Sequence, residues 1–527
     1  MQSFHAVTHR TLTVSLIALA ALAAPLAAPS ARADTVTLGA LPAPEDLHMT
    51  VVPRTKAEQA RIDKVTRPTT DFTAPETYET KQGGAASVRR GDTADAFSQP
   101  SANMSFEREL DFRVGNGLFK KLWVSSPSST LASDGLGPLY NARSCQRCHL
   151  KDGRGHPPES PEDSAVSMLV RLSVPDDGTA AVPDIEGYLA DRPDPVYGGQ
   201  LQDFSIAGHA AEARIRITYT EEEIVLAGGE TVSLRRPDLQ LVDPGYGPLR
   251  DDLMVSARVA PQMIGLGLLD AVPAADILAL ADPDDADGDG ISGRPNVVWS
   301  LDHDRPMLGR FGLKAGQPSI REQSAAAFSG DIGISTALHP AGSGDCTAAQ
   351  ADCMAAPNGN DPENGDVEIG EDGLDLVTFY SNNLAVPERG DLDDPQVLRG
   401  KQVFYESGCT ACHNPKFVTH RLENQPEQSF QLIWPYTDML LHDMGPDLAD
   451  NRPEARATGS EWRTPPLWGI GLTEQVSGHT YFLHDGRARS LMEAILWHGG
   501  EAAAARDRII ATPKPDRDAL IRFLESL

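Results

Sequence analysis

The sequence predicts a mainly α-helical protein made of two similar units, with a β-containing insertion between them. A five-residue pattern, C-x-x-C-H, occurs twice, at residues 145–149 and 409–413. Apolar residues near each copy recur every three or four positions, as they do along one face of a helix. Between the copies, residues 165–240 alternate apolar and polar positions, which is typical of strands. The repeated pattern defines the two units, and the change of period marks the insertion.

The repeated pattern is the attachment motif of a c-type haem. Its two thiols add to the vinyl groups of one porphyrin, and the histidine that follows ligates the iron. A thiol-disulfide centre or a structural zinc site fits less well, because a histidine follows each cysteine pair and the pairs lie far apart. Two covalently bound c-type haems are therefore predicted. Their expected binding residues are Cys145, Cys148, His149, Cys409, Cys412 and His413.

Composition and periodicity divide the chain into five segments. They are a signal peptide at residues 1–33, a low-complexity lead-in at 34–100, the N-terminal haem motif region at 101–164, the β-containing insertion at 165–370 and a C-terminal cytochrome c-like domain at 371–527. The first segment has a basic start, an apolar run and a small-x-small cleavage site, so export to the periplasm is expected. No other apolar run approaches about 18 residues, so no stable membrane span is expected after cleavage.

The elements are expected in a simple order. The C-terminal segment has the layout of a cytochrome c-like domain, because a helix precedes its motif and an amphipathic helix closes the chain. The expected elements are a helix at 106–123 with apolar residues every four positions, strands at 167–174 and 213–219, a hairpin at 223–234, helical residues at 259–281, a helix that Asp394 caps and a closing helix that ends at Leu527.

An acidic loop in the insertion matches the start of a calcium-binding loop. Asp285, Asp287 and Asp289 alternate and are followed by Gly290, and alternating carboxylates converge on one hard cation. The twelfth position is Asn296 and not the usual bidentate glutamate, so the loop is not a complete EF-hand. Calcium and a solvated acidic turn both remain open. Elsewhere in the insertion, Cys346 and Cys353 are expected to form a disulfide in an oxidising compartment.

His498 is the candidate second axial ligand of the C-terminal haem. Ser490 and Glu493 match a capping box that starts a helix, and His498 falls on the apolar face of that helix. The alternatives are a half-buried structural histidine and a positive charge favoured at a helix C-terminus. No such ligand is evident for the N-terminal haem. An exposed loop position suits His156 better than ligation, a structural role suits His209, His303 and His339, and a surface turn suits His442 as well as a ligand or pocket role.

Several further motifs resemble one family. Residues 137–145, 153–155, 287–296, 438–445, 463–469 and 484–500 are similar to the di-haem oxidoreductase, putative peroxidase family, which is also described as thiol oxidoreductase-like. That family is related to bacterial di-haem cytochrome c peroxidases, in which a methionine fourteen residues after a turn histidine is the sixth ligand. Here His498 stands fourteen residues after His484. The resemblance implies bis-histidine ligation of the C-terminal iron and places chemistry at the N-terminal haem.

The expected function is that of a periplasmic di-haem c-type cytochrome oxidoreductase, with electron transfer coupled to peroxide reduction. Two alternatives are a pure electron-transfer cytochrome and a haem-dependent oxygenase of an organic substrate. The formal net charge of −29 disfavours nucleic acid and anionic membranes as partners. It favours a small basic electron-carrier protein, although an acidic surface is also typical of a soluble exported protein.

Overall fold

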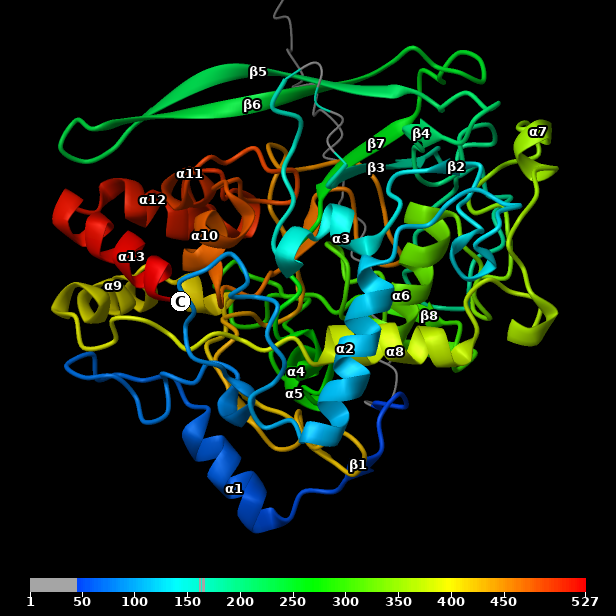
Figure 1. Ribbon diagram of the computed structural model, residues 1–527. Coiled ribbons are helices and arrows are strands. Elements are labelled where there is room, and N and C mark those ends of the chain that lie inside the picture. The colour runs from blue at the N-terminus through cyan, green and yellow to red at the C-terminus, as the bar shows by residue number, and fades with distance from the viewer. Residues whose placement is uncertain (1–44, 161–162, 164–165) are drawn as a thin grey trace, which may run out of the picture. The chain divides into compact units, whose positions relative to one another are not determined.

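The computed structural model describes residues 45–160, 163 and 166–527, all of which belong to one unit of the chain (Figure 1). The expected signal peptide at residues 1–33 lies outside these described residues. None of the described helices is both long enough and apolar enough to cross a membrane.

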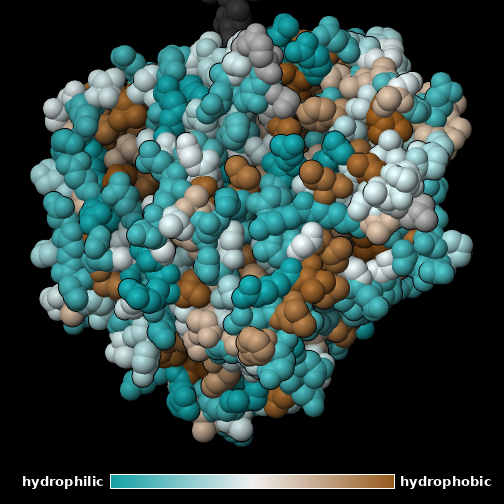
Figure 2. Space-filling view, viewed as in Figure 1, coloured by the Kyte–Doolittle hydropathy of each residue, from teal (hydrophilic) through white to brown (hydrophobic). Residues whose placement is uncertain are grey.

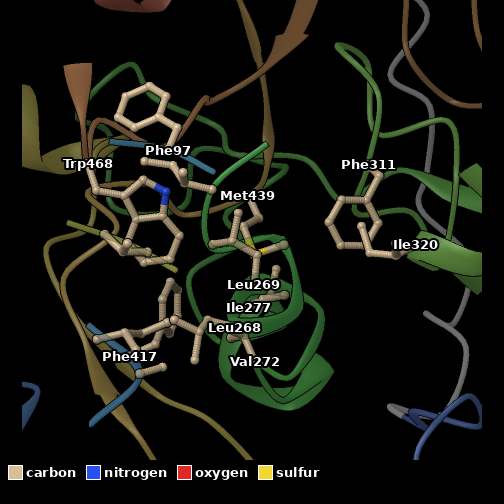
Figure 3. Close-up of a cluster of buried hydrophobic side chains, with 14 of the residues drawn as sticks. Phe97, Leu268, Leu269, Val272, Ile277, Phe311, Ile320, Phe417, Met439 and Trp468 are labelled. Carbon is tan, nitrogen blue, oxygen red and sulfur yellow. The ribbon is translucent and has the colours of Figure 1, made fainter. Parts of the chain in front are cut away.

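The prediction of a mainly α-helical fold with two cytochrome c-like units is wrong. The structure is 28% helix and 18% strand, and its strands form many small antiparallel sheets. The physical reason is a central core that both halves of the chain share (Figure 3). In this core Phe97 precedes the first motif, Leu268 and Phe311 belong to the insertion, and Phe417 and Trp468 follow the second motif. Neither half therefore buries its apolar residues by itself.

The α-helices of the described residues are short, and the longest has 15 residues. They are α1 (Lys56–Val65), α2 (Phe106–Lys120), α3 (Cys145–Cys148), α4 (Leu266–Asp270), α5 (Ala274–Leu278), α6 (Ile320–Ala327), α7 (Ala351–Met354), α8 (Glu371–Asn382), α9 (Pro395–Glu406), α10 (Thr473–Ser477), α11 (Leu491–Leu496), α12 (Ala503–Ala511) and α13 (Lys514–Ser526). Short 3₁₀ turns stand at Gly84–Ala86, Leu131–Ser133, Leu150–Asp152, Pro362–Asn364, Cys409–Ala411, Ile470–Leu472 and Gly500–Ala502, and a π-helical turn at Phe328–Ile332 continues α6.

The described strands pair two by two, and each pair is antiparallel. The pairs are β1 (Val51–Val52) with β11 (Arg421–Leu422), β2 (Leu139–Tyr140) with β4 (Phe204–Ser205), β3 (Met168–Ser173) with β7 (Met254–Val259), β5 (Arg214–Val225) with β6 (Thr231–Val242), β8 (Val297–Ser300) with β9 (Arg305–Leu308), β10 (Phe417–Val418) with β12 (Leu432–Ile433), and β13 (Leu441–Asp443) with β14 (Glu461–Arg463).

Several of the expected elements are confirmed. Helix α2, strand β3 and the β5–β6 hairpin lie where the periodicity places them. Helix α9 begins at Pro395, and its cap Asp394 accepts a hydrogen bond from Gln396 N at 2.9 Å. The helical pattern at 259–281 forms only the short helices α4 and α5, because Gly265 is left-handed and Pro273 stands before α5.

Helix α2 turns part of its apolar face to solvent. Leu110 is 65% exposed and Val114 45% exposed, while Phe112 and Phe119 are buried against α8. A Cβ atom on Gly115 would lie 2.2 Å from a backbone oxygen of α8, so this glycine permits the close packing. Figure 2, which has the same view, shows a group of apolar residues among hydrophilic ones near the position of α2.

Helices α9 and α13 cross closely beside the second motif. A Cβ atom on Gly400 would lie 1.9 Å from Ala519 O, so the crossing requires glycine at this position. The rings of Phe404 on α9 and Phe523 on α13 are 5.3 Å apart. The Phe404 ring is also 6.1 Å from the ring of His413. The two helices therefore support one side of the motif histidine.

Strands β5 and β6 form a long ribbon that extends over α11 and α12 (Figure 1). Near one end, Ile217 and Leu239 pack on the cluster that contains β3 and β7. Leu234 packs in a second cluster with residues of α11. Glu230 in the turn pairs with Arg517 of α13 at 2.7 Å. The β5–β6 ribbon therefore contacts the C-terminal helices α11 and α13 as well as the β3–β7 pair of the insertion.

The described part of the lead-in, residues 45–100, is tied to the rest of the unit by ion pairs and by strand β1. Asp46 pairs with Arg310, and His420 Nε2 lies 2.6 Å from its carboxylate. Glu79 is buried and pairs with Lys401 at 2.8 Å. This part of the lead-in therefore packs on the rest of the unit, and its composition does not prevent that.

The predicted disulfide between Cys346 and Cys353 is confirmed. The segment around it contacts the insertion through polar side chains. Gln350 donates a hydrogen bond to the buried Glu212 at 2.5 Å, and Asp345 accepts one from Gln200 N at 2.9 Å. These contacts fix the loop against the strands of the insertion.

Candidate functional site

Both C-x-x-C-H motifs begin as a helical turn. Helix α3 is the first cysteine pair itself, and the second pair begins a 3₁₀ turn after Gly408, whose φ is 85°. Residues three apart share one side of a helical turn, so each motif presents its two sulfur atoms together. Both pairs are free thiols. Burial raises the pKa of Cys145 and of Cys409 to about 12, which keeps these thiols neutral.

The two motif histidines are held in the same way. His149 Nδ1 lies 2.8 Å from Pro261 O, and His413 Nδ1 lies 2.8 Å from Tyr436 O. A carbonyl only accepts, so Nδ1 carries the proton and the Nε2 lone pair is left for another partner. Burial lowers the pKa of both rings to about 4, so they are neutral. A neutral imidazole with a free Nε2 is the form that ligates iron.

His498 has the same arrangement. Ser490 Oγ accepts a hydrogen bond from Glu493 N at 3.1 Å and caps α11, but only this half of the predicted capping box forms, because the Glu493 carboxylate accepts from Arg489 N at 2.9 Å. His498 Nδ1 lies 2.7 Å from Ala494 O, and burial lowers the pKa of this ring. Burial is the largest cause of the lowered pKa of His413, and the neighbouring His498 lowers it further. The two rings therefore lie within electrostatic range of each other.

One cavity of about 950 Å³ contacts both motifs. The residues predicted to hold haem all line it: Cys145, Cys148, His149, Cys409, Cys412, His413 and His498. Apolar side chains such as Leu169, Phe311 and Ile495 form much of the remaining wall. A large, mainly apolar cavity with a few convergent polar groups is typical of a cofactor site. Two thiols and one neutral imidazole at each motif fit a c-type haem.

The acidic loop is arranged differently from its sequence pattern. Carboxylate oxygens of Asp282, Asp285 and Asp287 lie within 4.8 Å of one another. Asp289, the third member of the pattern, lines the main cavity instead. The sequence pattern therefore identified two of the three clustered carboxylates. Calcium at this loop stays a prediction.

His442 is buried and engaged on both ring nitrogens. Its Nε2 lies 2.8 Å from Asp438 and its Nδ1 lies 2.7 Å from Glu501. Burial acts to lower its pKa, but the two carboxylates and Cys412 together raise it well above the usual range. Cys412 Sγ is 3.5 Å from His442 Nδ1. Both ring nitrogens of His442 are therefore engaged by carboxylates beside the second motif, which leaves neither of them for iron.

Other histidines in the cavity wall are His339 and His484. The His484 ring stacks on Trp462 with 3.9 Å between centroids and 13° between planes, and burial lowers its pKa to about 4. Sequence reasoning used His484 only as a family marker and did not single out Trp462. Trp123, Trp468 and Trp497 are buried in apolar clusters.

Several cavity-lining arginines were also missed, among them Arg154, Arg171 and Arg463. Arg154 and Arg463 lie within motifs that carried the family resemblance, so those motifs could have indicated them as candidate site residues. Arg171 stands at an alternate position of a predicted strand, where its side chain faces away from the apolar neighbours. No motif marks it.

Comparison with known proteins gives one strong match. The family model described as "Di-haem oxidoreductase, putative peroxidase" matches residues 77–527. No curated protein matches the chain. Among solved structures, a match to the hydrazine synthase of Kuenenia stuttgartiensis pressurised with xenon has 16% identity and a TM-score of 0.21, which is too low to support an argument about fold. It covers 36% of this chain and 64% of that chain, which is less than two thirds of its length.

The extent of the family match settles the classification. It includes both motifs, the insertion between them and the helix that leads to His498. The family name implies a haem-dependent oxidoreductase, in agreement with the donor sets that line the cavity. The chain belongs to the di-haem oxidoreductase, putative peroxidase family.

Proposed function

We propose that this chain is a periplasmic c-type cytochrome with two covalently bound haems, in which electron transfer is coupled to peroxide reduction. The main support is the shared cavity, where each motif has one neutral imidazole, and His498 and His442 act on the pKa of His413 whereas no histidine is among the causes that shift that of His149. Unequal axial ligation suits a peroxidase, because one iron keeps a position open for substrate while the other passes electrons.

Each part of the motif has a definite role in this proposal. The thiols of the two cysteine pairs form thioethers, and His149 and His413 ligate the irons. The haem, when bound, supplies one-electron chemistry and a position for the peroxide oxygen. The carbonyls of Pro261 and Tyr436 accept from Nδ1, which fixes the tautomer and orients each ring. The apolar wall limits the access of water and so strengthens these polar contacts.

The electron donor in this proposal is a small basic carrier protein. The support is the formal net charge of −29, which attracts a basic partner and speeds its approach at low ionic strength. Export by residues 1–33 places the two proteins in one compartment. Calcium at Asp282, Asp285 and Asp287 completes the proposed cofactors, with support from the convergence of these carboxylates.

Pure electron transfer is the second candidate. The observation that favours it is that His339 and His484 also line the cavity, and either ring would close the open position if it ligated the N-terminal iron. This alternative predicts low-spin ferric spectra alone and no binding of cyanide. Consumption of dioxygen with an organic substrate would instead favour the oxygenase.

The test uses purified mature protein with a reduced electron donor and hydrogen peroxide. We expect two haems per chain by the pyridine haemochrome assay and peroxide-dependent oxidation of the donor. The double substitutions C145A/C148A and C409A/C412A form a matched pair, and each is expected to lose one haem and the turnover. A two-haem protein that gives no turnover after prior reduction would contradict the peroxidase part.

A further inference from the structure

Strand β3 places one arginine on the wall of the cavity. Alternate residues of a strand face opposite sides, and Val170 and Leu172 are fully buried in the apolar cluster under β3. Leu169 and Arg171 face the other way and line the cavity. Arg171 pairs with Ser256 of β7 on one side and with Gln200 on the other, so its backbone position is fixed on both sides.

The guanidinium of Arg171 has no partner. No hydrogen bond or ion pair of 4.0 Å or less joins it to a described residue, and burial lowers its pKa. Asp331 attracts it from farther away, but one Asp331 oxygen already accepts from Gln200 at 2.8 Å. Glu454 attracts it too but is paired with Arg258 at 2.8 Å, and Arg258 and Arg452 oppose its charge. Arg171 is thus a positive charge with carboxylates in its surroundings but no direct partner among the described residues.

Other buried cations have direct partners in the described chain, either carboxylates or backbone carbonyls; Arg463, for example, donates to Gly312 O at 3.0 Å. Lys314 is 2.8 Å from Asp450, and Arg310 pairs with Asp46. Removing a cation from water is costly unless hydrogen bonds or an anion compensate it. The exception at Arg171 therefore points to an anionic partner that comes from outside the chain.

The location of Arg171 identifies the kind of anion. Cys148 Sγ donates to Val166 O at 3.0 Å just before β3, and His149 bonds to Pro261 O just after β7. Both strands of this pair thus begin or end beside the N-terminal motif. A planar guanidinium matches a carboxylate with two parallel hydrogen bonds. Haem carries two carboxylates on its propionate groups, and organic substrates often carry one.

We propose that Arg171 anchors a carboxylate-binding site beside the N-terminal haem motif. The carboxylate belongs either to a haem propionate or to a carboxylate-bearing small molecule that enters the same cavity. The first source rests on the haem part of the proposed function, and neither source depends on peroxide turnover. Arg171 acts by binding and positioning the carboxylate and takes no part in bond cleavage.

The experiment compares R171Q and R171K with R216Q in the full mature protein. Arg216 is a matched control, because it is an exposed strand arginine in the same insertion. In one arm, haem carries ¹³C at its propionate carboxyl carbons, and redox infrared difference spectra record the label-sensitive bands. In the other arm, benzoate is titrated against the Soret band of the ferric protein. R171K preserves the charge and covers the case in which R171Q does not fold.

A propionate partner predicts that label-sensitive bands shift in R171Q, shift less in R171K and stay unchanged in R216Q. A small-molecule partner predicts saturable binding of benzoate that is at least tenfold weaker in R171Q and unchanged in R216Q. If neither response depends on Arg171, the proposal is overturned. Turnover with peroxide, measured on the same samples, separates the two ideas, since a band shift without turnover contradicts only the peroxidase function. If the protein retains no haem, benzoate binding followed by calorimetry decides the proposal in the same way.

Discussion

The N-terminal motif lies between a helix and the ends of two strands, whereas the C-terminal motif lies among helices. Around the first, α2 supplies Phe119, and the segment after β7 supplies the carbonyl that accepts from His149. Around the second, α9 and α13 pack on one side, and α11 leads to His498 on another. One five-residue pattern thus has two surroundings, and only one of them places a second neutral histidine near the motif ring.

The buried carboxyl groups also differ between the two regions, because their pKa values are raised in the insertion and lowered in the C-terminal part. In the insertion, burial raises the pKa of Asp203 to about 7 and of Glu212 to about 8, because no cation lies close to them. In the C-terminal part, burial opposes but the arginines prevail, so the pKa of Glu454 falls to about 2. The pKa of Glu501 is also lowered, through His442 and Ser292. The insertion therefore tolerates neutral acids, while the C-terminal part is held by charge pairs.

The largest expected effect is the loss of the second axial histidine. Replacement of His498 by alanine should convert the C-terminal iron from low-spin to high-spin, because its ring is the candidate sixth ligand opposite His413. Electron paramagnetic resonance of the ferric protein measures this change. H339A is the matched control, since His339 lines the same cavity. Conversion in H339A but not in H498A would reverse the roles that we assign to the two surroundings.

Substitutions of the glycines at the close helix crossings beside the motifs should have the next largest effect, which is on the free energy of unfolding. G400A places a Cβ atom against Ala519 O, and G115A places one against α8, so each should lower the free energy of unfolding by about 3 kcal/mol. G117A is the control on α2, where nothing lies within 4 Å, and it should raise stability by about 0.5–1 kcal/mol. Urea unfolding gives the three values. Equal effects at Gly115 and Gly117 would mean that α2 does not pack closely on α8.

The parts of the structure that sequence could predict are local in origin. The motifs, the caps at Asp394 and Ser490 and the β5–β6 hairpin depend on residues a few positions apart. The shared core could not be predicted, because it requires Phe97, Phe311 and Trp468 to meet over long stretches of chain. His484 enters the cavity wall from a segment whose backbone bonds to β7, through Val259 N and His484 O. Arg171 likewise reaches the cavity wall through strand pairing, and no motif predicts it.

The neutral acids of the insertion predict an opposite pH response from the charge pairs. Glu212 has a pKa of about 8 when folded, against a usual value of 4.5, so the folded state keeps a proton that the unfolded chain releases. The stability due to this group should therefore be full below pH 4.5 and fall by a few kcal/mol as the pH rises to about 8. E212Q should flatten this slope in urea unfolding between pH 5 and 8.

The control for this pH response is E223Q, because Glu223 is exposed on the same insertion. This substitution should leave the slope of stability with pH unchanged. The comparison uses the slope and not the absolute stability, since glutamine at position 212 would also turn an amide donor towards Gln202 N, which now donates to the carboxylate at 2.7 Å. A slope in E212Q equal to that of the unmodified protein would show that Glu212 is ionised in the folded state.

The smallest expected effect concerns calcium, and it separates the sequence pattern from the observed cluster. Asp282 belongs to the cluster and Asp289 does not, although only Asp289 matches the pattern. Calcium at about ten times its Kd should stabilise the protein by about 1.4 kcal/mol. D282N should abolish this gain in thermal unfolding, and D289N should keep it. Because Ser292 at the end of the loop donates to Glu501 at 2.6 Å, and Glu501 bonds to His442, the stabilised region should be the C-terminal surroundings. If calcium instead slowed hydrogen exchange around the N-terminal motif, the expected coupling of the loop to the C-terminal surroundings would be wrong.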